Sequence, residues 1–282
     1  MSRLHRPVLA DRADPAVWEV ARPSRSAGMP GTTMAGFGIP AGGPIRIVPH
    51  PAVMVVLVFG AGTASLDDVA GRHRLGSFAA APGFGSGAVV RAHGSRVECL
   101  QVRLSPVTAS TVLGVPAAAL AGAVPLHDLW GAAVPVIEER LARAPSWTER
   151  FGLVEALLSD RASTGPPVDP GVGWAWRRIV TEHGRGRVEA VATELGWSRA
   201  RLWARFRSHL GMGPKRAASL VRFDHAAHRL VAGHSPARVA AEGGYADQSH
   251  LHREVRAFSG TTPSGLAGEP FLAVDRRAWG RG

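Results

Sequence analysis

A short helical pattern occurs twice in the last third of the chain, and it constrains the fold more than any other feature. The first copy reads GWSRARLWARFRSHLGMGP over residues 196–214, and the second reads GYADQSHLHREVRAFSGTTP over residues 244–263. The closing proline Pro214 aligns with Pro263 at an offset of 49, whereas the leading glycines align at an offset of 48. The extra residue falls in the turn, where an insertion is tolerated best. Two copies of one helical unit indicate one task that is performed twice.

Each copy has the pattern of a capped amphipathic helix that follows a glycine turn. Ser198 and Asp247 can accept hydrogen bonds from the free N–H groups of a first helical turn. Apolar residues follow them at helical spacing, and the rows that we expect to be buried are Leu202, Phe206 and Leu210 in the first copy and Leu251, Val255 and Phe258 in the second. A shorter helix pattern precedes each copy, and a longer one, from Pro214 to about Val231, joins them. The sequence therefore predicts two helix-turn-helix units in tandem.

The second helix of each unit is the candidate recognition helix, which must offer hydrogen-bonding groups to base edges in a major groove. The outer positions that we expect to contact DNA are Arg199, Ala200, Arg201, Trp203, Ala204, Arg205 and Arg207 in the first unit, and Gln248, Ser249, His250, His252, Arg253 and Arg256 in the second. Glutamine can pair with adenine, and arginine can pair with guanine or a phosphate. A solvated basic helix face is the alternative for the arginines, but the helix-turn-helix pattern favours DNA contact.

The net charge agrees with a polyanionic partner. The chain carries +11, and 18 basic against 10 acidic residues give +8 over residues 166–282, whereas 15 against 12 give only +3 over residues 1–165. All the basic residues except Lys215 are arginine, a bias typical of a GC-rich genome, so the asymmetry between the halves is the stronger signal. A basic C-terminal half indicates nucleic acid as the partner.

The sequence divides into two domains at STGPPVDPG, residues 163–171, whose prolines and glycines cannot continue a helix. We expect an N-terminal regulatory, effector or dimerisation domain over 1–162, a DNA-binding domain over 172–268 and a tail over 269–282. The expected N-terminal fold is α+β, a small sheet or partial barrel followed by helices, and the expected C-terminal fold is all-α.

The N-terminal domain carries several strand patterns after a first stretch, residues 1–44, that reads mainly as loops with one or two short edges. Strands are expected over 53–59, 77–81, 88–91 and 96–104, and helices over 106–113, 134–143 and 146–160. In the last strand Val97, Cys99, Gln101 and Arg103 should face one way and the intervening residues the other.

Residues 172–268 resemble the DNA-binding domain of the AraC/XylS family of bacterial transcription regulators. The resemblance rests on VATELGWSRARLWARF with GMGP, and above all on VAAEGGYADQSHLHREVRAFSGTTP. It implies two helix-turn-helix units whose recognition helices enter consecutive major grooves on one face of the DNA. It also implies a partner in double-stranded operator or promoter DNA, RNA polymerase where the protein activates, a small-molecule effector and a homodimer. The family usually carries an arginine two residues after the leucine of each recognition helix, which is Arg253 in the second unit but Ala204 in the first.

Other residues have two interpretations each. Cys99 is a small core residue or a reactive thiol, and the HDLW segment, residues 127–130, is a helix start with a core anchor or the wall of an effector pocket. The stripe from Phe151 to Leu158 is core or a dimer surface. His225 and His228 are spaced to share a ligand, but a zinc site needs more ligands than are evident. In each case we expect the structural role, and we expect no metal and no cofactor.

The sequence contains no catalytic constellation, so we expect a regulator and not an enzyme. The alternative is a DNA-repair alkyl-transfer protein with an AraC-like module, which requires a nucleophilic cysteine and cysteine zinc ligands, whereas this chain has one cysteine. The N-terminus lacks the apolar core of a signal peptide, and the longest apolar run is too short to span a membrane. We therefore expect a soluble, cytoplasmic protein.

Overall fold

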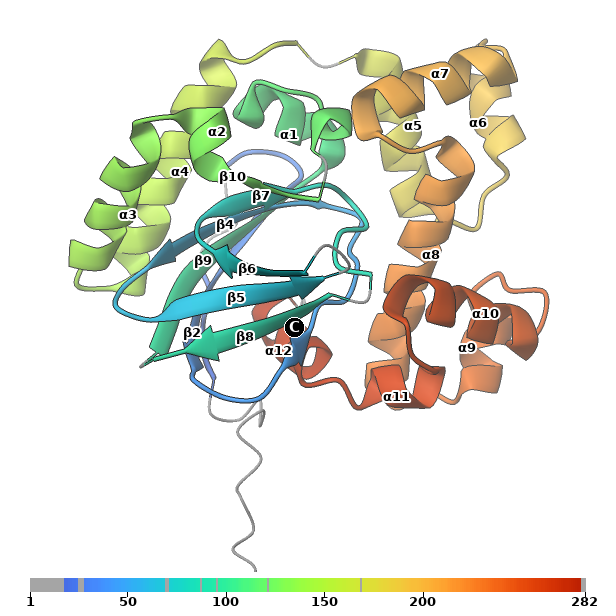
Figure 1. Ribbon diagram of the computed structural model, residues 1–282. Helices are drawn as coiled ribbons and strands as arrows, with labels where there is room; N and C mark the ends of the chain where they lie inside the picture. The colour runs from blue at the N-terminus through green and yellow to red at the C-terminus, as the bar shows by residue number, and fades with distance from the viewer. Residues whose placement is uncertain are drawn as a thin grey trace, which may run out of the picture.

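The structure is a computed structural model that describes residues 18–24, 28–68, 71–86, 88–94, 96–120, 122–167 and 169–279. Its N-terminal half is a two-sheet sandwich with helices on one outer face (Figure 1). The strands are β1 (Glu19–Ala21), β2 (Thr32–Pro40), β3 (Ile45–Arg46), β4 (Val53–Phe59), β5 (Thr63–Asp68), β6 (Gly71–Leu75), β7 (Phe78–Ala80), β8 (Val89–His93), β9 (Arg96–Leu104) and β10 (Ala123–Pro125). Sheet A has the order β1-β2-β9-β4-β7-β10, and sheet B has the order β3-β8-β5-β6.

The two faces of sheet A have different roles because successive side chains of a strand point to opposite sides. Val55 of β4 and Leu100 and Val102 of β9 are buried against the helices α1 (Pro106–Leu113), α2 (Leu126–Trp130), α3 (Ala133–Arg143) and α4 (Trp147–Thr164). Cys99 and Gln101 point the other way, toward sheet B. The alternation expected for residues 96–104 is thus confirmed, as are the strand over 53–59 and the helix over 106–113.

Strand β2 is one of the elements that the sequence analysis missed, since residues 1–44 were expected to be mainly loops, and β5 and β6 are others. Strand β2 pairs antiparallel with β9 from Thr32↔Leu104 to Pro40↔Arg96 and lies inside sheet A. Its glycines suggest a loop in the sequence, but Gly36 lies directly under the Trp147 ring, where a Cβ atom would come within 2.3 Å of the ring. The glycine therefore makes room for an aromatic side chain on the strand.

The C-terminal half is a bundle of helices with two hydrophobic cores. Its helices are α5 (Pro170–Thr181), α6 (Val188–Glu194), α7 (Arg199–Leu210), α8 (Pro214–Val231), α9 (Pro236–Glu242), α10 (Gln248–Ser259) and α11 (Pro263–Ala267). One core contains residues of α5 to α8, and the other contains residues of α8 to α11. Helix α8 belongs to both cores, so it joins the two helix-turn-helix units rigidly.

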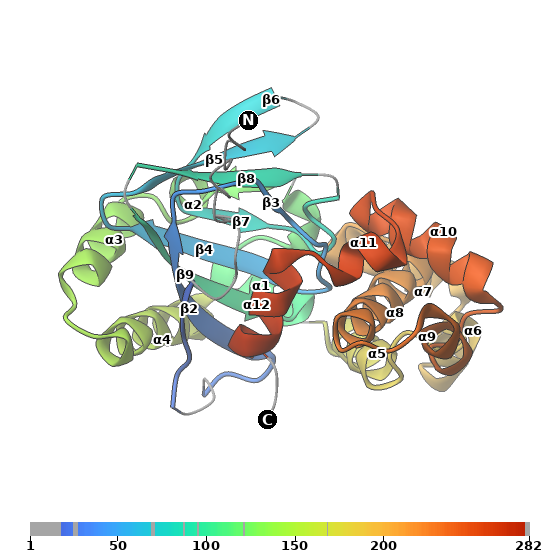
Figure 2. The ribbon, with the colours of Figure 1, turned by 90° about the horizontal axis from the view of Figure 1, so that it is seen from below.

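The chain ends in a further helix, α12 (Pro270–Trp279), which leaves the bundle and returns to the sheet domain. It contacts β1, β2 and β3 as well as α8, and Figure 2 shows it lying on the strands, apart from the bundle. Val274 and Ala278 are buried in the inter-sheet core. The residues that we expected to form a tail after 268 therefore connect the two halves.

Further contacts between the halves involve both helix-turn-helix units. The 3-10 helix η2 (Ala117–Ala119) and α1 lie against α7, and Arg46 forms an ion pair with Glu269 at 2.9 Å. Among the described residues, no helix is long and apolar enough to cross a membrane.

Candidate nucleic-acid interface

Helix α7 is capped at both ends and buried along one side. The Ser198 hydroxyl accepts a hydrogen bond from the backbone N–H of Arg201 at 3.1 Å, as its expected role as a cap requires. Gly211 ends the helix in the left-handed conformation with φ 76°, which glycine adopts without strain. Leu202 and Phe206 are fully buried, and Leu210 is nearly so. This row anchors α7 on α5 and α8, and leaves the opposite side to solvent.

Helix α10 repeats this arrangement. The Asp247 carboxylate accepts a hydrogen bond from the backbone N–H of His250 at 2.6 Å, and Leu251 and Val255 are fully buried. An internal ion pair adds to the anchoring, because Arg222 Nε of α8 donates to Glu254 Oε1 at 3.1 Å. Both expected helix caps and both expected buried rows are thus confirmed.

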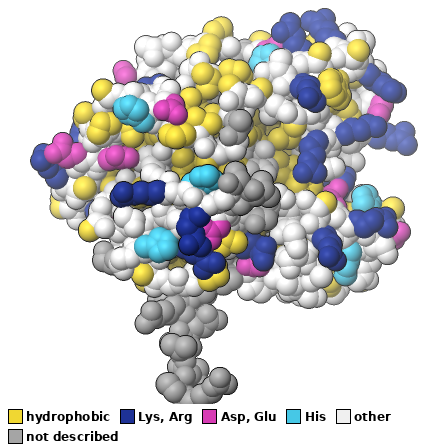
Figure 3. All heavy atoms as spheres, in the orientation of Figure 1, with side chains coloured by type: hydrophobic (Ala, Val, Ile, Leu, Met, Phe, Trp, Pro, Cys, Tyr) yellow, Lys and Arg dark blue, Asp and Glu magenta, His cyan; other side chains and the backbone are white. Residues whose placement is uncertain are grey.

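The expected DNA-contacting positions lie on the outer sides of these two helices. In α7 the exposed ones are Arg199, Ala200, Arg201, Trp203, Ala204, Arg205 and Arg207, and in α10 they are Gln248, Ser249, His252, Arg253 and Arg256. Figure 3 shows Lys and Arg side chains gathered on the side of the molecule that carries these helices in Figure 1. The structure leaves the expected contacts accessible to a large ligand.

Several α7 side chains are held by neighbouring groups. The Arg201 guanidinium lies 4.8 Å from the centroid of the Trp197 ring, and the Arg207 guanidinium lies 5.1 Å from that of Trp203. Arg205 Nη1 is 3.6 Å from the Asp169 carboxylate. Trp203 itself is half exposed, which is unusual for so large an apolar group. The two guanidinium–ring contacts limit the rotamers that Arg201 and Arg207 can adopt.

The first turn of α10 forms a shallow hollow with polar walls. Gln248, Ser249, His252 and Arg253 line it. Within the described part of the chain, Arg253 has no hydrogen-bond or ion-pair partner, so its planar donor group is free. Free backbone N–H groups at a helix start also favour an approaching phosphate.

His250 differs from the other expected contacts because it is half-buried. Its Nδ1 accepts a hydrogen bond from the backbone N–H of Ala246 at 3.3 Å, and its ring packs edge-on against Tyr245. This histidine stabilises the turn that leads into α10.

Two basic residues beside α7 were not singled out in the sequence. Lys215 and Arg216, at the start of α8, share a groove with Arg199 and Trp203. They lie in the joining helix and outside both repeat units, so no motif marks them. The sequence marks Lys215 only as the one lysine of the chain, and nothing in the sequence marks Arg216.

The residues with two interpretations have structural roles. Burial raises the pKa of the Cys99 thiol to about 12, so the thiol is protonated and a poor nucleophile. Trp130 is buried in the main core, whereas His127 is exposed, and Phe151 and Leu158 are buried core residues. No cluster of three metal-ligating side chains occurs among the residues that the structure covers.

Comparisons with known proteins match the C-terminal part to a family model and the overall fold to solved structures. Residues 191–268 match the family model described as a helix-turn-helix domain. The fold is similar to that of a lysine-to-alanine variant of ToxT from Vibrio cholerae in its apo form. The two chains are 10% identical, the TM-score is 0.50, and the match covers 87% of this chain and 99% of that chain. The C-terminal domain of AraT, a response regulator from Geobacillus stearothermophilus, matches 35% of this chain and 84% of its own length at 22% identity, with a TM-score of 0.33. A comparison with curated proteins gives no match.

Proposed function

We propose that this chain, whose residues 191–268 match a helix-turn-helix family model, is a transcription regulator of the AraC/XylS family and reads two consecutive major grooves of a specific operator with α7 and α10. One observation carries this proposal. Two capped helices, both anchored on α8, expose rows of arginine and polar side chains on one side of the molecule. Consecutive major grooves on one DNA face lie roughly 34–36 Å apart, the spacing that tandem reading heads require.

The two helices have different contacts available. In α10, Arg253 can bond guanine at two atoms and Gln248 can pair with adenine. In α7, Ala204 stands at the position that corresponds to Arg253, and the stacked pair of Trp203 and Arg207 offers an apolar surface and a phosphate contact. We therefore propose that α10 supplies most of the base recognition and that α7 supplies mainly phosphate and shape contacts.

Binding to double-stranded DNA at increasing salt tests this function. Contacts from these arginines release counterions, so for roughly 6–10 phosphate contacts affinity should fall about 10³–10⁵-fold from ~50 to ~200 mM salt. The Arg207→Ala variant should have a shallower salt slope. Arg140→Ala, an exposed arginine on α3 at the far side of the molecule, is the matched control and should keep the slope. Affinity that is independent of salt would contradict the proposal.

Regulation without catalysis is also part of this proposal. The alternative of alkyl transfer requires a thiolate, and the raised pKa of the buried Cys99 argues against one. Control by a small-molecule effector finds support in the cavity between sheets A and B of the N-terminal domain.

A further inference from the structure

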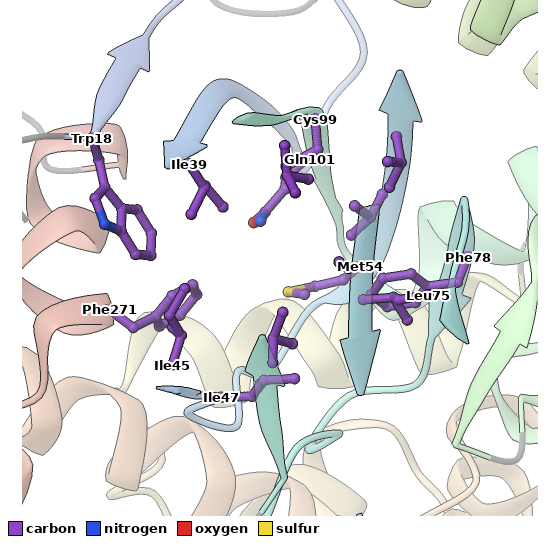
Figure 4. Close-up of a pocket in the computed structure, with 15 residues that line it drawn as sticks. Trp18, Ile39, Ile45, Ile47, Met54, Leu75, Phe78, Cys99, Gln101 and Phe271 are labelled. Atoms are coloured by element: carbon purple, nitrogen blue, oxygen red, sulfur yellow. The ribbon is translucent and has the colours of Figure 1, made fainter. Parts of the chain in front are cut away.

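Sheet B has an apolar inner face and a basic outer face, because successive side chains of a strand point to opposite sides of a sheet. Ile45 of β3 and Leu75 of β6 point toward sheet A, into the space between the sheets (Figure 4). Their neighbours on the same strands, Arg46 and Arg74, therefore point outward. Figure 3 shows Lys and Arg side chains over the strands of sheet B that face the viewer in Figure 1.

The pairing of the strands aligns the outward residues in two rows. Neighbouring strands lie about 4.8 Å apart, so a row extends over about 14 Å from β3 to β6. Four of the seven described residues in these rows are arginine and one is acidic, whereas protein surfaces usually intersperse both signs. We call these seven residues the arginine face: Arg46, Val89, Asp67 and Arg72 in the first row, and Arg91, Ser65 and Arg74 in the second.

A single carboxylate orients two of the arginines. Arg72 donates from Nε and Nη2 to the Asp67 carboxylate at 2.7 and 3.0 Å, and Arg91 donates from Nε at 2.9 Å. These bonds use two of the five N–H donors of Arg72 and one of those of Arg91. The hydrogen bonds from Arg72 and Arg91 also hold the pKa of Asp67 well below its usual range, so Asp67 is charged at neutral pH. Arg74 has no hydrogen-bond or ion-pair partner within the described part of the chain.

The charge and the composition of the arginine face select its partner. Arg46 is neutralised by Glu269, which leaves three arginines against Asp67, a surplus of two positive charges. Binding to a membrane surface needs an apolar face beside the cations, and Val89 is the one apolar residue of the seven. A polyanion that is bound through its phosphates requires only the cations. The arginine face therefore fits a nucleic-acid backbone.

The arginine face begins beside the C-terminal end of α10. The Ser86 hydroxyl donates to the backbone oxygen of Ala257 at 3.4 Å, and a Cβ atom at Gly260 would lie 3.8 Å from Arg46 Nη1. Figure 2 shows sheet B on the same side of the molecule as α10, away from α5. A recognition helix places its N-terminal residues on base edges. Its C-terminal end therefore lies toward the rim of the groove, where the sugar-phosphate backbone passes.

We propose that the arginine face binds the sugar-phosphate backbone beside the groove that α10 reads, with Arg72, Arg74 and Arg91 as the phosphate contacts. This inference rests on the proposed function, which places α10 in a major groove. It makes the N-terminal domain a third DNA-binding element of the chain. Phosphate contacts carry no sequence information but fix register and orientation. The arginine face therefore strengthens binding to all sequences alike and holds α10 in its half of the operator.

The salt dependence of DNA binding by the full chain tests these contacts. The probe is a duplex that carries the motif selected from a random DNA pool. Each lost phosphate contact lowers the salt slope by about 1, so Arg72→Gln/Arg74→Gln should lower it by about 2. Between ~50 and ~200 mM salt, the affinity of this variant should then fall about tenfold less than that of the unaltered chain. Arg140→Gln/Arg143→Gln, which removes two exposed charges from α3, is the matched control and should keep the slope.

Hydroxyl-radical footprinting of the same duplex locates the contacts. The full chain should protect backbone positions beside the α10 element in addition to those covered by the two reading helices, and Arg72→Gln/Arg74→Gln should lose only these. Arg74→Glu keeps the hydrogen bonds of Asp67 and places a negative charge on the face. It should weaken binding to every operator variant by the same factor, and it provides a second variant if the double variant loses its circular dichroism signal.

Each outcome decides a different claim. An unchanged salt slope and an unchanged footprint in both variants would overturn the arginine face as a DNA contact and leave the proposed function standing. Failure of the unaltered chain to bind any duplex would overturn the proposed function and this inference together. Co-sedimentation with phosphatidylglycerol vesicles that depends on Arg74, together with an unchanged footprint, would assign the face to a membrane and contradict the proposal.

Discussion

The Arg103 guanidinium of β9 forms a buried ion pair with the Asp275 carboxylate of α12, although 172 residues separate them in the sequence. The Trp279 ring covers the guanidinium at 4.2 Å. Removal of one partner of such a pair leaves an uncompensated buried charge. The pair therefore favours one arrangement of the two halves.

His228 extends this ion pair and makes it sensitive to pH. Its Nδ1 is 2.8 Å from the backbone oxygen of Asp224, and its Nε2 is 2.8 Å from the Asp275 carboxylate, so both ring nitrogens face acceptors. Burial alone would lower the pKa of His228, but the hydrogen bond to Asp275 and the charge of Asp224 raise it to about 9.

A folded-state pKa above the ordinary value of 6.5 means that the charged histidine stabilises the fold. This contribution is complete below about pH 6.5 and is lost as the pH rises through about 9. The neighbouring titratable groups change charge below this pH range. Burial raises the pKa of Asp224 to about 6, and burial together with the charge of Arg103 lowers the pKa of His50 well below its ordinary value of 6.5. We predict that the urea midpoint falls between pH 7 and 9.5, and that His228→Gln flattens this fall. An equal fall in the variant would contradict the assignment.

Arg253 should read a base. Arg253→Ala should cost about 1–3 kcal/mol of binding free energy and relax the preference at one base pair, because a bidentate contact to guanine is lost. Arg207→Ala should weaken all sequences about equally, as a phosphate contact does. The measurement is binding of each variant to a panel of single-base operator changes. If Arg253→Ala weakens binding to every operator variant by the same factor, Arg253 contacts only a phosphate and reads no base.

Ala204 offers the reverse experiment in the first unit. It is exposed on α7 and corresponds to Arg253, so Ala204→Arg should fit without repacking the core. We predict a new guanine preference in the half of the operator that α7 contacts, and no change in the half that α10 contacts. The same panel of operators measures it, and an altered preference in the α10 half would show that the halves are not read separately.

The helical half should fold without the sheet domain if it ends before α12. The buried residues of the core between α5 and α8 all lie within 172–221, with Val107 of α1 packed against them, and the second core takes Val48, Phe271 and Leu272 from outside 169–268. We predict that the fragment 169–268 is monomeric, helical by circular dichroism and able to bind DNA. The fragment 169–282 carries α12 with Val274 and Ala278 unpartnered, and gel filtration should show self-association. An unfolded shorter fragment would mean that the two halves share one core.

The sequence pattern predicted the features that depend on interactions within a single helix or strand. The caps at Ser198 and Asp247 and the alternation along β9 follow from hydrogen bonding and side-chain direction within one element. Strand β2 could not be predicted in this way, because Gly36 is explained only by the Trp147 ring that packs on it.

The relation between the two halves depends on contacts that no local pattern contains. Residues 269–282 gave no indication that α12 returns to the sheet domain, since the pairing of Asp275 with Arg103 is a property of the assembled fold. The same applies to the cavity. The alternation placed Gln101 on one face of β9, but only the position of sheet B shows that this face is incompletely packed.

In vitro selection of DNA from a random pool with the full chain tests the central claim most directly. Two reading heads on α7 and α10 predict an enriched motif with two elements about 10–10.5 base pairs apart, more strictly specified in the element that α10 contacts. Repeating the selection with Arg253→Ala should degrade that element alone. A pool without an enriched motif would contradict sequence-specific reading by these helices.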